Sequence, residues 1–123
     1  MTPLPMCTAF DCTLRARIDA LALGDHAVAR DVTCALIETN RATLVFMMAA
    51  RHSEAWDDLG RAAHRLAGSL GMLQCSREIS LARRLERAAF ERDALTIVAL
   101  LPFVAEAVDQ LNEQLNGLLT SPT

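Results

Sequence analysis

The sequence predicts an all-α protein: an antiparallel four-helix bundle with a short additional N-terminal helix. Apolar residues recur at intervals of three and four along most of the chain, and no segment alternates apolar and polar residues over a useful length. Ala and Leu supply most of the apolar content, and both favour helix over strand. Short polar connections separate the amphipathic segments, which is typical of helices that pack antiparallel to their neighbours.

The length of 123 residues and the 52% of hydrophobic residues predict one domain with a buried core. We expect residues 1–8 to form a flexible arm, because Pro3 and Pro5 oppose regular structure. The bundle is expected over residues 9–118. Residues 119–123 are expected to form a flexible tail.

The first two helices are predicted from cap residues and periodicity. A short helix is expected over residues 11–23, ending at Gly24, and Asp25 can cap a long helix that ends near Arg51. Thr39 and Asn40 interrupt the apolar stripe of the long helix. The stripe consists of Val28, Val32, Ala35, Leu36, Leu44, Met47 and Met48.

Three further helices are predicted in the same way. We expect Ser53, Ser76 and Asp93 to cap the third, fourth and fifth helices. Pro102 lies inside the fifth helix and is expected to kink or split it. The apolar positions of the third helix are Leu59, Ala62, Ala63, Leu66, Leu70 and Leu73, those of the fourth are Ile79, Ala82, Leu85 and Ala89, and those of the fifth include Leu95, Val98, Leu101, Val108 and Leu115.

The charge pattern argues against nucleic-acid and membrane binding. The net charge is −3, the 12 basic residues are all Arg without a basic block, and aromatic residues make up only 4%. The N-terminus has no signal-peptide pattern, and no window has 18 uncharged apolar residues. We therefore expect a cytoplasmic protein that does not insert into a membrane.

The four cysteines, Cys7, Cys12, Cys34 and Cys75, match no metal-binding spacing. We expect reduced thiols, with Cys34 and Cys75 partly buried. A disulfide between Cys7 and Cys12 remains an alternative. No cofactor or metal site of the chain's own is expected.

His64 is the candidate functional residue. On a helical wheel it lies about 140° from the centre of the apolar stripe, so it is expected to face solvent. Gly60, Gly68 and Gly71 lie near it on the same helix, although glycine in a helix interior costs roughly 0.5–1 kcal/mol relative to alanine. Their bareness would let a macromolecule approach the imidazole. The alternative is that Gly71 marks the helix end and Gly60 has no role.

An exposed neutral imidazole is a competent nucleophile. The sequence offers no acid–base pair, phosphate-binding glycine loop or metal cluster to accompany it. His64 would therefore accept a group only from a partner that brings the remaining machinery.

The segment AAHRLAGSLGML, residues 62–73, resembles the core of histidine-containing phosphotransfer (HPt) domains, whose motif reads approximately H-x-L-K-G-S. His64, Leu66, Gly68 and Ser69 match this motif. The preceding AWDDLGRAAH and the later LARRLERAA are similar to the neighbouring parts of the family, and the resemblance covers residues 11–118.

The resemblance implies a phosphorelay carrier without autonomous kinase activity. His64 would accept a phosphoryl group on Nε2 from a response-regulator receiver domain, which carries Mg²⁺, and pass it to another receiver. A hybrid sensor kinase would be a further partner. The resemblance implies a docking surface around Gly60, Ala67, Gly68, Gly71 and Met72.

One position departs from the family. The family lysine three residues after the histidine is replaced by Ala67, and we expect Arg61, or less directly Arg65, to balance the phosphoryl charge instead. The same departure leaves open a helical bundle that binds proteins but is not phosphorylated. The arginines Arg83, Arg84 and Arg87 are interpreted as part of a solvated ion-pair face, with steering of an acidic partner as an alternative.

Overall fold

The computed structural model describes residues 9–120, with side chains from Thr13 onwards. Within this range the chain is helical without strands, which confirms the predicted fold class. The expected arm, the tail beyond Thr120 and the Cys7–Cys12 pair lie outside the described structure. The helices are α1 (Ala9–Leu21), α2 (His26–His52), α3 (Trp56–Met72), α4 (Ser76–Phe90) and α5 (Ala94–Thr120).

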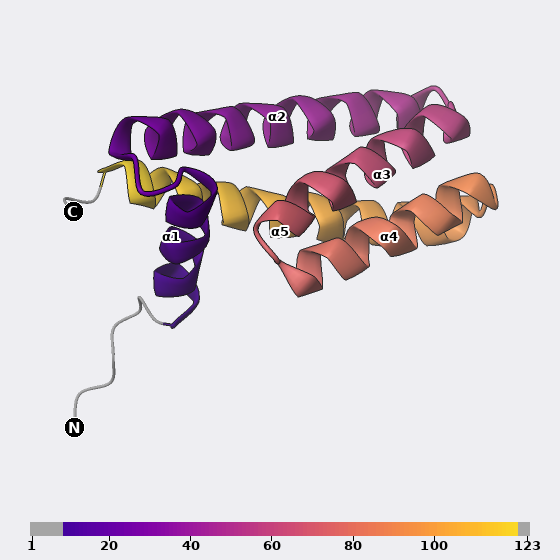
Figure 1. Ribbon diagram of the computed structural model, residues 1–123. Helices are drawn as coiled ribbons and strands as arrows, with labels where there is room; N and C mark the ends of the chain where they lie inside the picture. Colours follow the sequence, from indigo (N-terminus) through magenta and orange to yellow (C-terminus); the bar gives the residue numbers. More distant parts are fainter. Residues whose placement is uncertain (1–8, 121–123) are drawn as a thin grey trace.

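The two long helices, α2 and α5, run the length of the bundle, whereas α3 and α4 cover one half of it (Figure 1). Each long helix has 27 residues and so spans roughly 40 Å, against roughly 25 Å for the 17 residues of α3. The short α1 lies at the other end, steeply inclined, and contacts both α2 and α5 (Figure 1). It thus covers apolar surface of the long helices that α3 and α4 do not reach.

The core lies between all five helices and is almost entirely aliphatic. Leu59, Leu66 and Leu70 of α3 are at most 2% exposed, as their spacing predicts. Leu85 of α4 and Ile97 of α5 are fully buried. Among the described helices, α3 and α4 make the most extensive contact with each other.

The predicted stripe of α2 is partly wrong. Val28, Ala35 and Met48 are exposed, whereas Asn40, expected to interrupt the stripe, is buried. The Asn40 amide Nδ2 donates to Asn112 Oδ1 of α5 at 3.0 Å. This hydrogen bond pairs one polar atom of each amide, whereas Asn40 Oδ1 and Asn112 Nδ2 are buried and have no hydrogen-bond partner among the described residues.

Two of the predicted caps are present and two are wrong. Asp25 accepts the backbone N–H of Val28 at 3.1 Å and caps α2. Ser53 instead ends α2, with its hydroxyl donating to the Ala49 carbonyl at 3.0 Å. Ser76 is the first residue of α4 rather than its cap. The N-caps of α3 and α4 are Ala55 and Cys75, which make no side-chain cap hydrogen bond.

The helix connections explain these differences. Each connection contains a non-glycine residue in the left-handed region just after the preceding helix: Leu23, Glu54, Gln74 and Arg92 have φ of 55–57°. The Ala55 N–H then donates to the Ala50 carbonyl at 2.8 Å, which closes the end of α2. The residues before the left-handed position therefore belong to the preceding helix, and Ser53 is not free to cap the next one.

Pro102 does not split α5, contrary to one form of the prediction. The helix continues from Ala94 to Thr120, two residues beyond the expected boundary at 118. Pro102 is exposed, and Val98, whose carbonyl loses its helical donor, is 48% exposed. Pro102 therefore lies on the solvent-facing side of α5 and not in the core.

Of the described helices, α5 is the one that is long and apolar enough to cross a membrane by length and composition. In its most apolar window, 39% of the residues are buried inside the bundle. Val104, Val108 and Leu111 of this helix are each 1% exposed, so its apolar face packs against the other helices.

Asp93 caps α5, as predicted, and this cap gives a test of stability against pH. The Thr96 hydroxyl donates to one carboxylate oxygen at 2.6 Å and the Thr96 N–H donates to the other at 3.2 Å. These bonds, the hydroxyl first, lower the pKa of Asp93. The contribution of this cap to the stability of the folded state is therefore fully present above the usual pKa of an aspartate. It is lost as the pH falls through the lowered pKa of Asp93 in the folded state.

We expect Asp93→Ala to lower Tm at pH 7 by a few degrees, and this difference from the wild type to close in acid. Asp109→Ala, at an exposed position in the middle of the same helix, serves as the control and should change Tm much less. Thermal unfolding followed by circular dichroism over a pH series measures both. A difference that persists unchanged in acid would contradict the role of the Asp93 carboxylate.

Candidate functional site

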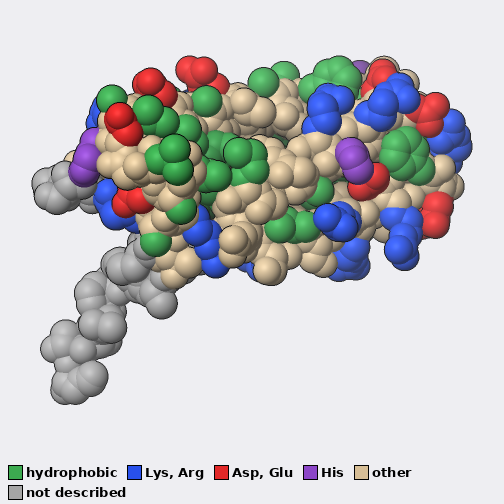
Figure 2. Space-filling view, in the orientation of Figure 1, with side chains coloured by type: hydrophobic (Ala, Val, Ile, Leu, Met, Phe, Trp, Pro, Cys, Tyr) green, Lys and Arg blue, Asp and Glu red, His purple; other side chains and the backbone are tan. Residues whose placement is uncertain are grey.

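His64 lies on the outer face of α3, in a shallow groove between α3 and α4. Its side chain is 74% exposed, as the helical wheel predicts. The groove is lined by residues of both helices: His64, Ala67, Gly68, Arg83, Glu86, Arg87 and Phe90. Figure 2 shows arginine side chains gathered over this half of the molecule, with a histidine and an acidic side chain among them.

Glu86 of α4 holds the imidazole of His64. The distance between His64 Nδ1 and Glu86 Oε2 is 2.9 Å, and the glutamate side chain is 25% exposed. An ionised carboxylate only accepts hydrogen bonds, so Nδ1 must carry the proton that is shared with Glu86. In the neutral ring the lone pair then lies on Nε2, so this is the ring nitrogen that is chemically able to act as a nucleophile.

The glycines near His64 have two different roles. Gly68 and Gly71 are exposed, and a Cβ atom added at either would meet nothing within 4 Å. Gly60 is buried, so its expected place on the docking surface is wrong. A Cβ atom at Gly60 would lie 2.7 Å from the Phe90 ring, because the end of α4 packs against α3 here. The absence of a side chain at Gly60 thus leaves room for the Phe90 ring, which lines the groove.

Ala67 also differs from its expected place on the surface. It is 4% exposed, because it faces α4 more than solvent, although it still borders the groove. Met72, at the end of α3, is 51% exposed and lies on the surface as expected. The bare surface beside His64 therefore consists of Gly68 and Gly71.

Comparison with models of known protein families identifies the family to which this helical bundle belongs. The family model that describes the Hpt domain matches residues 31–120, which is more than half of the chain. This chain belongs to the Hpt domain family. Hpt domains take part in histidine phosphotransfer in phosphorelays and interact with receiver domains of response regulators or hybrid kinases. Searches of the curated proteins and of the solved structures find no match.

The two arginines expected to balance a phosphoryl group in this Hpt domain make other contacts. Arg61 forms an ion pair with Asp58, one turn earlier on α3, at 2.9 Å. The Arg65 guanidinium lies over the Phe46 ring of α2, 5.8 Å from its centroid. Neither lines the groove of His64. The structure thus leaves the proposed role of both residues without a supporting contact.

The sequence indicated Arg83 and Arg87 only as part of a charged face that could steer an acidic partner, and it placed no residue of α4 beside His64. Arg83, Glu86, Arg87 and Phe90 are spaced at i, i+3, i+4 and i+7, so they share one face of α4. That spacing is visible in the sequence. What the sequence does not contain is the rotation that turns this face of α4 toward His64 rather than toward open solvent.

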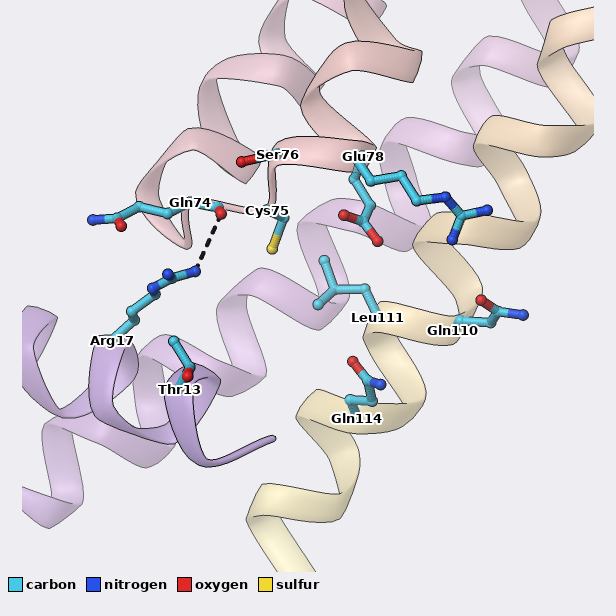
Figure 3. A pocket seen from close by; sticks show the side chains of 10 residues that line it. Thr13, Arg17, Gln74, Cys75, Ser76, Glu78, Gln110, Leu111 and Gln114 are labelled. Atoms are coloured by element: carbon cyan, nitrogen blue, oxygen red, sulfur yellow. Dashed lines mark hydrogen bonds between the residues drawn. The ribbon is translucent and has the colours of Figure 1, made fainter. Parts of the chain in front are cut away.

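A second hollow lies between α1, the α3–α4 connection and α5 (Figure 3). Arg17 of α1 donates to the carbonyls of Leu73 at 2.7 Å and Gln74 at 3.1 Å, which fastens α1 to the bundle. Burial, then the charge of Glu78, raises the pKa of the Cys75 thiol to about 11. This thiol stays protonated at neutral pH and is a poor nucleophile.

The remaining histidines and cysteines form no second centre in the described part of the chain. His26 and His52 are exposed at opposite ends of α2. Cys34 is exposed, contrary to the expectation of partial burial, because it lies on the outer face of α2. Among residues 9–120, no group of three or more His, Cys, Asp and Glu side chains is arranged to hold a metal ion.

Proposed function

We propose that this Hpt domain is a phosphorelay intermediate whose acceptor is Nε2 of His64. The phosphoryl group would come from the aspartyl phosphate of one receiver domain and pass to the aspartate of another. The observation that carries this proposal is the exposed imidazole held through Nδ1 by Glu86, with Nε2 directed away from that contact.

In the transfer step, the Nε2 lone pair attacks phosphorus in line with the bond to the aspartate oxygen. The P–N bond forms, the P–O bond breaks, and the aspartate carboxylate leaves with the electron pair. No proton has to move, because the ring keeps its Nδ1 proton and becomes an imidazolium. Glu86 stabilises the positive charge that develops on the ring.

The receiver would supply the rest of the chemistry, including Mg²⁺ bound at its own site. The groove of His64 is shallow and open, with one nucleophile and one carboxylate, and it contains no nucleotide-binding loop. We therefore propose a phosphoryl carrier without kinase activity of its own. Its contribution is a rigid helix pair that presents the imidazole.

The experiment that tests this function is phosphotransfer profiling against phosphorylated receiver domains from the same genome. We expect at least one receiver to label the protein with phosphate that is labile in acid and stable in base, as a phosphohistidine is. A protein that binds a receiver without becoming labelled would instead be the non-phosphorylated interaction module that the replacement of the family lysine by Ala67 suggests.

Glu86 gives a second prediction about the same step. We expect Glu86→Leu to slow phosphorylation of His64 by about tenfold, because the imidazole loses both its orientation and the charge that stabilises the imidazolium. Glu86→Gln keeps an acceptor for the Nδ1 proton and should lose less. Stopped-flow transfer from a labelled receiver gives the rates.

Nitrogen NMR of the histidine ring separates this role from a structural one. The wild type should show the proton on Nδ1 at alkaline pH, and Glu86→Leu should show a mixture of both tautomers. Equal rates and equal tautomer populations in the three proteins would contradict the assignment.

A further inference from the structure

Two arginines of α4 border the groove of His64 and have no partner of their own. Arg83 and Arg87 line the groove one helical turn apart, on either side of Glu86. In the described part of the chain, neither guanidinium has an ion pair, a hydrogen bond or a ring contact. Glu86, which lines the same groove, is bound to His64.

The other sources of positive charge around His64 are absent or engaged. Position 67 is a buried alanine. On α3, Arg61 is paired with Asp58 and Arg65 lies over Phe46. The unpartnered cations at the groove are therefore on α4, the helix opposite the one that carries the histidine.

We propose that Arg83 and Arg87 form the anion-binding pair that receives the phosphoryl group carried by His64, in place of a cation on α3. This inference rests on the proposed function and names the residues that bind the transferred group. An arginine guanidinium is suited to the role because its N–H groups match the oxygens of a phosphoryl group.

The charges of the groove support the assignment. Once phosphorylated, the ring is an imidazolium, and Glu86 balances its charge. The phosphoryl group brings a charge of about −2, and the two arginines bring an equal positive charge. Phosphorylation thus brings the groove close to neutrality, whereas the unmodified groove has an excess of positive charge that attracts an anionic donor.

The test uses potassium phosphoramidate, which phosphorylates histidine without a receiver. In this reaction the Nε2–P bond forms, the P–N bond of phosphoramidate breaks, and ammonia leaves. The variants are Arg83→Gln, Arg87→Gln and the double variant. Arg84→Gln is the matched control, because it removes the same charge from the same helix but Arg84 does not line the groove of His64.

We expect each single variant to be phosphorylated about two- to fivefold more slowly and the double variant to lose more, with Arg84→Gln close to wild type. The differences should shrink in 1 M salt, since exposed charges are then screened. Phosphorus NMR titration should show a higher pKa of the phosphoryl group in the double variant, because neighbouring cations favour its dianion.

Two outcomes overturn the proposal in distinguishable ways. If phosphoramidate and phosphorylated receivers both fail to label the wild type, the proposed function fails and the arginine pair with it. If the wild type is labelled but the double variant matches Arg84→Gln in rate and in phosphoryl pKa, only the arginine pair is wrong. Circular dichroism checks that the exposed substitutions leave the helices intact.

Discussion

His64→Gln should accept no phosphoryl group from any receiver that labels the wild type. We expect a loss of at least about a thousandfold, which is the scale seen when a nucleophile is removed. A glutamine side chain is similar in length to histidine and also forms hydrogen bonds, but its amide nitrogen has no lone pair available for attack on phosphorus. Transfer of labelled phosphate from a receiver, followed on gels, measures the loss.

The substitution should separate chemistry from folding. The His64 side chain is 74% exposed, so the change of volume disturbs no core packing. We expect Tm to stay close to that of the wild type and receiver binding to persist. His52→Gln, at the exposed end of α2, is the matched control and should be labelled normally. Undiminished labelling of His64→Gln would remove His64 from the mechanism.

Gly68→Gln should make the domain more stable and its receiver binding weaker. Gly68 is an exposed position inside α3 with open space around it, so a larger residue there meets no atom of this chain. Replacing an exposed helical glycine with a good helix former should raise the free energy of unfolding by about 0.5–1 kcal/mol. The added side chain would occupy the exposed surface beside His64, which we propose as the docking surface for the receiver.

We expect the affinity of Gly68→Gln for a receiver to fall by roughly tenfold or more, since a central clash at an interface is costly. Gly117→Gln is the control, because Gly117 is also an open helical position but lies near the far end of α5. It should raise stability without changing affinity. Isothermal titration with a receiver and thermal unfolding give both quantities. Equal affinity of the two variants would show that the bare surface beside His64 has no role in docking.

The fold was largely predictable because its signals are local. The periodicity of Leu59, Leu66 and Leu70 specifies which face of α3 is buried, and the caps at Asp25 and Asp93 depend only on residues three positions away. The errors arose where neighbouring segments compete. Ser53 had the chemistry of an N-cap, but the end of α2 uses it. The sequence around Asn40 indicates a break in the apolar stripe of α2, but in the structure Asn112 of α5 supplies a hydrogen-bond partner for this buried side chain.

By itself, the sequence determined an all-helical bundle with His64 exposed on a helix that carries open glycines, because helical periodicity places a residue relative to its own helix axis. Only the tertiary structure decided what borders the imidazole. The rotation and separation of α3 and α4 follow from how their side chains interdigitate. That packing buries Gly60 under Phe90, brings Glu86 to Nδ1 of His64, and turns Arg83 and Arg87 toward the groove rather than Arg61.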